Sequence, residues 1–119
     1  MPHPVVHFEV SAKDASAQRE FYTAVFDWDV TVYEEANYMM LGTRAGDSGI
    51  DGGLFQNEDG RSYVTVYVQV DDLAAYLDKA ASHGATPVMQ PTEVPGGGSV
   101  ALMTDPEGNI VGLYKPQQE

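Results

Sequence analysis

The chain has 119 residues, a formal net charge of −12 and no cysteine. This length fits one ordinary domain, and an apolar fraction of 43% is enough to build a core. Six Lys and Arg against eighteen Asp and Glu argue against binding to nucleic acids or anionic membranes, because both need clustered cations. The lack of cysteine excludes disulfide scaffolds, thiolate metal sites and cysteine nucleophiles. With no targeting segment or long apolar stretch visible, we expect a cytoplasmic protein.

The first half of the sequence predicts a strand, a helix and three further strands. Residues 5–10 alternate between two faces, with Val6, Phe8 and Val10 on one face and Val5, His7 and Glu9 on the other. A helix is predicted from Ala15 to about Val25, with an apolar stripe that includes Phe21 and Val25. Short strands are expected at 28–33, 38–43 and 50–56.

The second half repeats this order. Residues 63–70 alternate, which places Val64 and Val66 on one face and Thr65 and Tyr67 on the other. Asp71 or Asp72 can cap a following helix, whose apolar residues fall at helical spacing: Leu73, Tyr76, Leu77 and Ala80. Strands are expected at 86–94, 99–104 and 109–114, joined by hairpin turns at 95–98 and 105–108.

These patterns predict one α+β domain built from two βαβββ units, at about 4–57 and 62–116. We expect an open, curved mixed sheet with a trough on one face and the helices on the outer face. Neither unit is expected to be stable alone, so the two pair within one chain or across a dimer, and a homodimer is predicted.

Several segments carry a family resemblance: Val6–Val10 before a helix with Phe21 and Tyr22, the strand with Gly52-Gly53-Leu54, residues 66–72, and Thr104–Asn109 before the last strand. Together they resemble the vicinal oxygen chelate superfamily, which includes glyoxalase I, bleomycin-resistance proteins and extradiol dioxygenases. The resemblance covers essentially the whole chain and implies the same fold.

The resemblance also implies where a catalytic metal would be held. His7 matches the first ligand position, but the other three positions hold Gly53, Thr65 and Gly112. Because a divalent metal usually needs about three converging donors, no metal cofactor is expected. A displaced site made of His7, Glu9 and Gln69 is left open by the spacing.

The trough face offers candidate ligand-binding residues. These are His7, Glu9, Phe55, Thr65, Tyr67, Gln69 and Tyr114. Aromatic rings with a few polar groups suit a flat small molecule, although the same rings could fill the trough or form a dimer interface. His7 and Glu9, about 6.5–7 Å apart on one strand face, are either an acid–base pair or a structural hydrogen-bonded pair.

The function expected first is metal-free binding of a small organic molecule, as in the bleomycin-resistance proteins. An acidic chain would favour a cationic ligand. One alternative is a metal-dependent lyase, isomerase or dioxygenase of the glyoxalase type that uses the displaced site. The other is a non-catalytic interaction domain with a filled trough.

Overall fold

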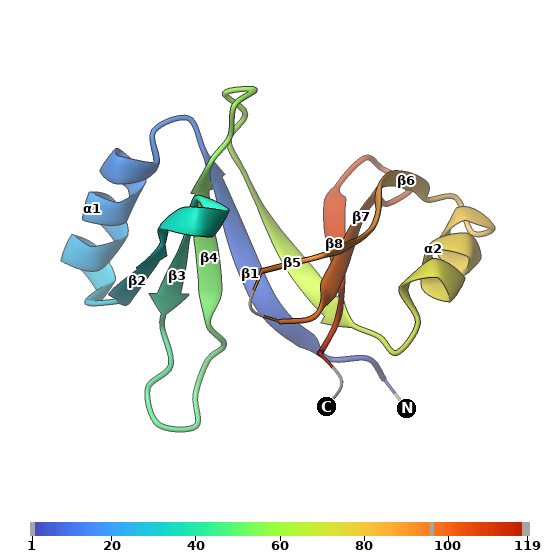
Figure 1. Cartoon of the computed structure of the whole chain (residues 1–119), viewed down its shortest axis with the longest axis horizontal. Helices are drawn as coiled ribbons and strands as arrows, with labels where there is room; N and C mark the ends of the chain where they lie inside the picture. The colour runs from blue at the N-terminus through green and yellow to red at the C-terminus, as the bar shows by residue number, and fades with distance from the viewer. Residues whose placement is uncertain (1, 96, 118–119) are drawn as a thin grey trace. The chain divides into compact units, whose positions relative to one another are not determined.

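A computed structural model describes residues 2–95 and 97–117, and in them it places two α-helices and eight strands (Figure 1). The strands are β1 (Val5–Ala12), β2 (Asp29–Tyr33), β3 (Tyr38–Gly42), β4 (Gly52–Gln56), β5 (Tyr63–Gln69), β6 (Thr86–Glu93), β7 (Ser99–Thr104) and β8 (Ile110–Lys115). The helices are α1 (Ala15–Phe26) and α2 (Leu73–Ala81), and a short 3₁₀ helix η1 spans Glu34–Ala36. The predicted α+β class with its repeated βαβββ order is confirmed. Gly96, within the predicted turn at 95–98, lies outside the described residues.

The chain divides into two compact halves. The first half comprises residues 7–65, and the second comprises residues 2–6 and 66–117. In the first half the strand order is β2-β3-β4-β1, with β1 and β4 parallel and the other pairs antiparallel. In the second half the order is β5-β8-β7-β6, with β5 and β8 parallel and the other pairs antiparallel. Both halves therefore carry the mixed pairing of a βαβββ unit.

The core of the first half lies between α1 and its sheet. Buried residues of the strands and of the start of α1 form it: Val10, Ala12, Ala15, Leu41 and Leu54. Tyr22 of α1 packs against this cluster, whereas Phe21 and Val25 are about half exposed. The apolar stripe predicted for this helix is therefore wrong at these two positions, because α1 turns a narrower face to the sheet.

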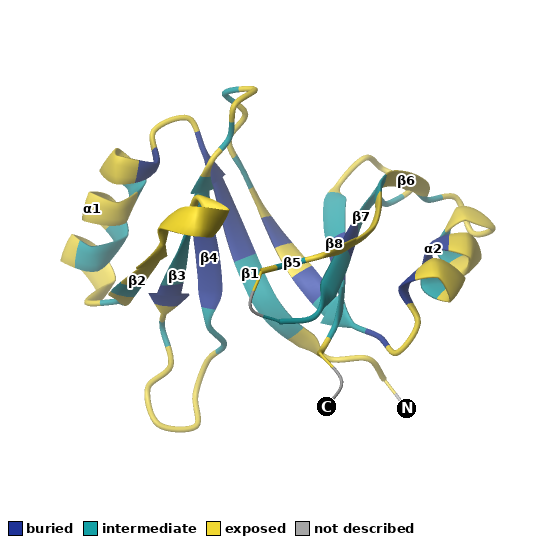
Figure 2. Ribbon diagram, viewed as in Figure 1, coloured by how far each residue is buried: buried dark blue, intermediate teal, exposed yellow. Residues whose placement is uncertain are grey.

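The core of the second half lies under α2. It is formed by Val70, Leu73, Leu77, Ala101 and Leu113. α2 contacts β6, β7 and β8, and Val68 of β5 packs against this cluster. Val64 and Val66 of β5 are 63% and 38% exposed, although the alternation placed them on the helix-covered face. Figure 2 shows exposed segments along β5.

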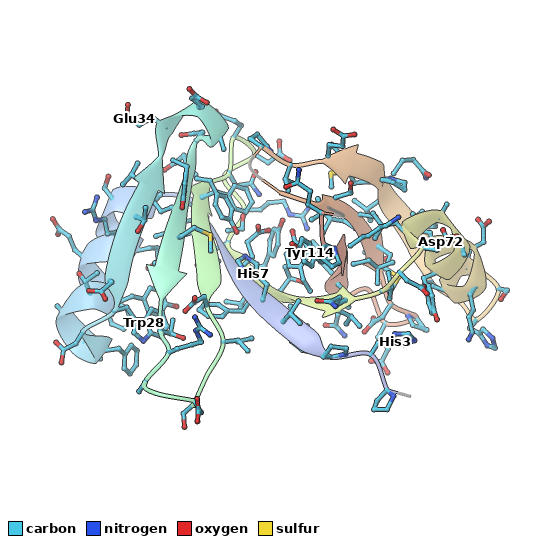
Figure 3. The ribbon with its side chains drawn as sticks, turned by 60° about the horizontal axis from the view of Figure 1, so that its bottom comes forward. His3, His7, Trp28, Glu34, Asp72 and Tyr114 are labelled. Atoms are coloured by element: carbon cyan, nitrogen blue, oxygen red, sulfur yellow. The ribbon has the colours of Figure 1, made fainter. Side chains whose placement is uncertain are left out.

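Neither helix in residues 2–95 and 97–117 is long and apolar enough to cross a membrane. Each begins at an aspartate whose side chain accepts a hydrogen bond from the first turn: Asp14 from the Ala17 N–H at 3.1 Å, and Asp72 from the Ala75 N–H at 3.0 Å. Of the two predicted caps for α2, the structure selects Asp72. Its labelled side chain lies at the start of that helix (Figure 3).

Replacing Asp72 with alanine should lower the free energy of unfolding by about 1 kcal/mol, because an N–H in the first turn of α2 loses its acceptor. The matched change at its exposed neighbour, Asp71→Ala, should alter it by less than about 0.5 kcal/mol. Urea unfolding followed by circular dichroism measures both values. Equal losses in the two variants would contradict the assignment of the cap.

Candidate functional site

A glycine on the central strand β4 of the first half determines the geometry of the candidate site. Gly53 lies on β4, between Glu9 on β1 and Met40 on β3. A Cβ atom at Gly53 would lie 1.6 Å from the hydroxyl oxygen of Tyr38. The glycine thus leaves room for the ring of Tyr38 to cross β4 and reach β1. Any other residue at this position would force the ring to move.

The crossing ring joins two of the predicted site residues. The hydroxyl of Tyr38 donates a hydrogen bond to Oε2 of Glu9 at 2.8 Å, and Nε2 of His7 lies 2.9 Å from the same hydroxyl oxygen. Phe55 lies beside Tyr38 in the register, with their ring centroids 6.4 Å apart. We call His7, Tyr38 and Glu9 the His–Tyr–Glu cluster. With Phe55, it brings three predicted binding residues together in one half.

The electrostatics of the cluster favour a neutral imidazole. Burial lowers the pKa of His7 below its usual 6.5, and the negative charge of Asp51 opposes that shift in part. Asp51 is itself held in place, since its Oδ1 accepts from the Thr43 N–H at 3.1 Å and its Oδ2 lies 3.5 Å from Nε of Arg44. Glu9 is only 9% exposed and accepts the tyrosine hydrogen.

The second half repeats the pairing of a glycine with a tyrosine ring. Gly112 on β8 faces Tyr67 on β5, and a Cβ atom at Gly112 would lie 2.4 Å from the ring of Tyr67. Gln69 and Tyr114 are the next same-face neighbours in the register. Gln69 also lines a cleft of about 320 Å³ that is bounded by residues 3–4, 69–71 and 115–117.

The remaining predicted residue, Thr65, is 3% exposed in the first half, and Tyr67 is 5% exposed in the second. Sequence reasoning missed Tyr38 as a site residue, because its role depends on reaching β1 across one intervening strand, β4. The signal that could have found it is the pair Gly52-Gly53 inside a strand. Such glycines mark the close approach of another group to the backbone.

Residues 5–113 match the sequence model of the Glyoxalase/Bleomycin resistance protein/Dioxygenase superfamily. The chain belongs to this superfamily. It is 34% identical over 100 residues to the "Putative glyoxylase CFP32" proteins of Mycobacterium bovis and Mycobacterium tuberculosis, a match that covers 81% of this chain and 38% of theirs. It is 23% identical over 124 residues to the "Anthracycline biosynthesis protein DnrV" of Streptomyces peucetius, covering 91% of this chain and 45% of that one. The chain thus spans less than half the length of these curated relatives.

Solved structures share the superfamily fold at low sequence identity. Methylmalonyl-CoA epimerase from Mycobacterium tuberculosis aligns with a TM-score of 0.65 at 14% identity, covering 96% of this chain and 88% of that one. A superfamily member from Vibrio splendidus 12B01 aligns with a TM-score of 0.63 at 15% identity, covering 95% of this chain and 98% of that one. The predicted family and fold are confirmed.

The residues of this superfamily member do not fit the metal site that the resemblance implies. Within residues 2–95 and 97–117, no three His, Asp or Glu side chains gather in a way that could hold a metal ion. At two implied ligand positions, Gly53 and Gly112, a tyrosine ring lies where a ligand side chain would begin. Glu9, a possible donor, already accepts a hydrogen bond from Tyr38.

The fit of Tyr38 over β4 can be tested at Gly53. Gly53→Ala should lower the free energy of unfolding by about 1–3 kcal/mol, because the added methyl group displaces the tyrosine ring. Gly42→Ala on β3 is the matched control, since its Cβ would lie 3.5 Å from the nearest atom, an ordinary contact. In a Tyr38→Ala background the cost at Gly53 should largely disappear. Equal costs in the two backgrounds, measured by urea unfolding, would contradict this contact.

The lowered pKa of His7 makes stability depend on pH. As pH falls below about 6.5, the unfolded chain takes up the His7 proton before the folded protein does, so the folded state loses stability. The unfolding free energy is therefore unaffected by His7 ionisation above about pH 6.5, and it falls as the pH drops from there toward the lower pKa of the folded state. His7→Gln should therefore flatten the fall in unfolding free energy between about pH 6.5 and 5. An unchanged slope in urea titrations would show that burial does not lower this pKa.

Proposed function

We propose that this superfamily member binds a small planar organic molecule without a catalytic metal, at the face of the first-half sheet that carries the His–Tyr–Glu cluster and Phe55. The observation that carries the proposal is the hydrogen-bonded cluster itself, which sets polar groups of defined direction beside aromatic rings. Such a combination orients a flat ligand by hydrogen bonds and holds it by stacking.

Charge favours a cationic ligand. Glu9 and Asp51 lie on or next to this face, and the chain carries only six Lys and Arg. The relative from Streptomyces peucetius is named for anthracycline biosynthesis, and anthracyclines are planar molecules with an amino sugar. An anthracycline is therefore a reasoned first probe.

Thr65 in the first half and Tyr67, Gln69 and Tyr114 in the second half remain predicted ligand-binding residues. A homodimer and a cytoplasmic location likewise stay predictions.

Binding can be tested with daunorubicin, a fluorescent cationic anthracycline, and with 1,4-dihydroxyanthraquinone, an uncharged planar molecule. Fluorescence titration should show saturable binding of both, with daunorubicin bound more tightly at low salt because of its charge. His7→Gln and Glu9→Gln should weaken the binding of daunorubicin by about tenfold each, the loss of one good polar contact. Neither change should abolish folding.

Glu34→Gln is the control, because it removes the same charge from an exposed residue of η1. It should leave both affinities within about twofold of the wild type. If neither probe binds, or if the cluster variants bind as well as the control, the proposed function is wrong. Large losses of stability in both cluster variants without any binding would instead show that the cluster is structural.

A further inference from the structure

The outer strand of the first-half sheet, β2, has an open edge. In the order β2-β3-β4-β1 this strand pairs with β3 alone among the residues that the structure describes, in a regular antiparallel register from Asp29 to Tyr33. Its other edge therefore presents backbone N–H and C=O groups to which a further strand can bind. No proline interrupts β2, and its residues Val30 and Val32 are of a type that favours strands.

The outer strand of the second half, β6, is protected against such pairing. It carries Pro87 and Pro91, which have no N–H to donate. Its register with β7 also shifts twice, between Pro87 and Met89 and between Met89 and Thr92. Prolines and irregular pairing are common protections of an edge strand. β2 has neither, although four of its five residues are exposed (Figure 2).

One face of β2 offers apolar surface. Val32 pairs with Met39, which packs against the core under α1, so this valine lies on the helix-covered face of the sheet. It is nonetheless about half exposed. Just before β2, the half-exposed ring of Phe26 lies 5.3 Å from the ring of Trp28. A strand added beside β2 would extend this face and cover Val32.

The surroundings of β2 are acidic. Residues 20–43 contain no Lys or Arg and five carboxylates, which belong to Glu20, Asp27, Asp29, Glu34 and Glu35. Asp29 and Tyr33 are exposed on the face of β2 opposite Val32, where a carboxylate and an aromatic ring both suit a cation. Glu34 lies at one end of β2 and Trp28 at the other (Figure 3). Charge complementarity therefore favours a basic partner over a second copy of this chain, which itself carries −12.

We propose that β2 is a docking edge for an extended basic segment of another protein. The segment adds as a further strand, with its apolar side chains on the face of Val32 and its Lys or Arg side chains on the face of Asp29 and Tyr33. In strand addition of this kind, main-chain hydrogen bonds give affinity and alternate side chains give specificity. The proposal does not depend on the small-molecule function, since it needs no occupant at the His–Tyr–Glu cluster.

The side-chain pattern is tested with fluorescein-labelled peptides. A heptapeptide of alternating lysine and valine should bind saturably in an anisotropy titration at low salt. An isomer with its valines grouped together should bind about tenfold more weakly, because it cannot present one apolar and one basic face. The alternating peptide with a fully N-methylated backbone should lose at least as much affinity, because it has no N–H donor. Equal affinities of the three peptides would overturn the proposal.

The place of binding is tested with a matched pair of variants. Val32→Lys should weaken binding of the alternating peptide by about tenfold or more, because a charge then stands at the apolar position of the edge. Val88→Lys adds the same charge to an exposed valine of β6 and should leave the affinity within about twofold of the wild type. Equal losses in the two variants would contradict docking at β2.

A second measurement needs no substitution. In hydrogen exchange followed by NMR, bound peptide should slow the exchange of amides in residues 29–33 by about tenfold, since an added strand accepts their outward N–H groups. Exchange in β6 should stay unchanged. Protection confined to other segments would overturn the proposal.

A second copy of this chain is the competing occupant of the edge. Sedimentation analysis distinguishes it, because any dimer of the wild type should persist in Val32→Lys. A dimer that dissociates in Val32→Lys but not in Val88→Lys, together with no binding of the alternating peptide, would overturn the proposal and assign the edge to self-pairing.

Discussion

One glycine in each half, Gly53 or Gly112, determines how a tyrosine ring packs on the sheet. Gly53 and Gly112 leave open backbone in the middle of a strand, and in each half a tyrosine ring occupies that space. In the second half the ring comes from the directly paired strand, so Tyr67 covers its own partner. In the first half the ring also comes from the neighbouring strand, but Tyr38 is paired with Phe55 rather than with Gly53, and its hydroxyl reaches Glu9 on the far side of β4. The same constraint therefore places a tyrosine ring over a glycine in both halves, and in the first half that ring also joins His7 and Glu9.

Local pattern was enough to predict the order of the elements. Alternation of apolar residues located β1 and β5 to within two residues, and helical spacing together with a capping aspartate located α2. These signals are local because they depend on neighbours along the chain. The family resemblance extended them to the whole fold.

The site was only partly predictable, because it depends on contacts between strands that are distant in sequence. His7, Glu9 and Phe55 were found by their shared face, but Tyr38 joins them only through the order β3-β4-β1. The exposure of Val64 and Val66 was missed for a related reason, since alternation divides the residues of a strand between two faces and does not say which positions of a face other elements cover. Both features that were missed, the role of Tyr38 and the exposure of the two valines, depend on tertiary contacts.

The only tryptophan of the sequence, Trp28, gives this architecture a built-in optical reporter. Its ring stacks on Tyr22 with centroids 5.1 Å apart and planes 5° from parallel, and Phe26 and Phe8 lie at 5.3 and 5.7 Å. Emission from this indole therefore senses the helix side of the first-half sheet. Phe8 and His7 are consecutive on β1 and point to opposite faces, so fluorescence records the integrity of that layer from behind the polar cluster.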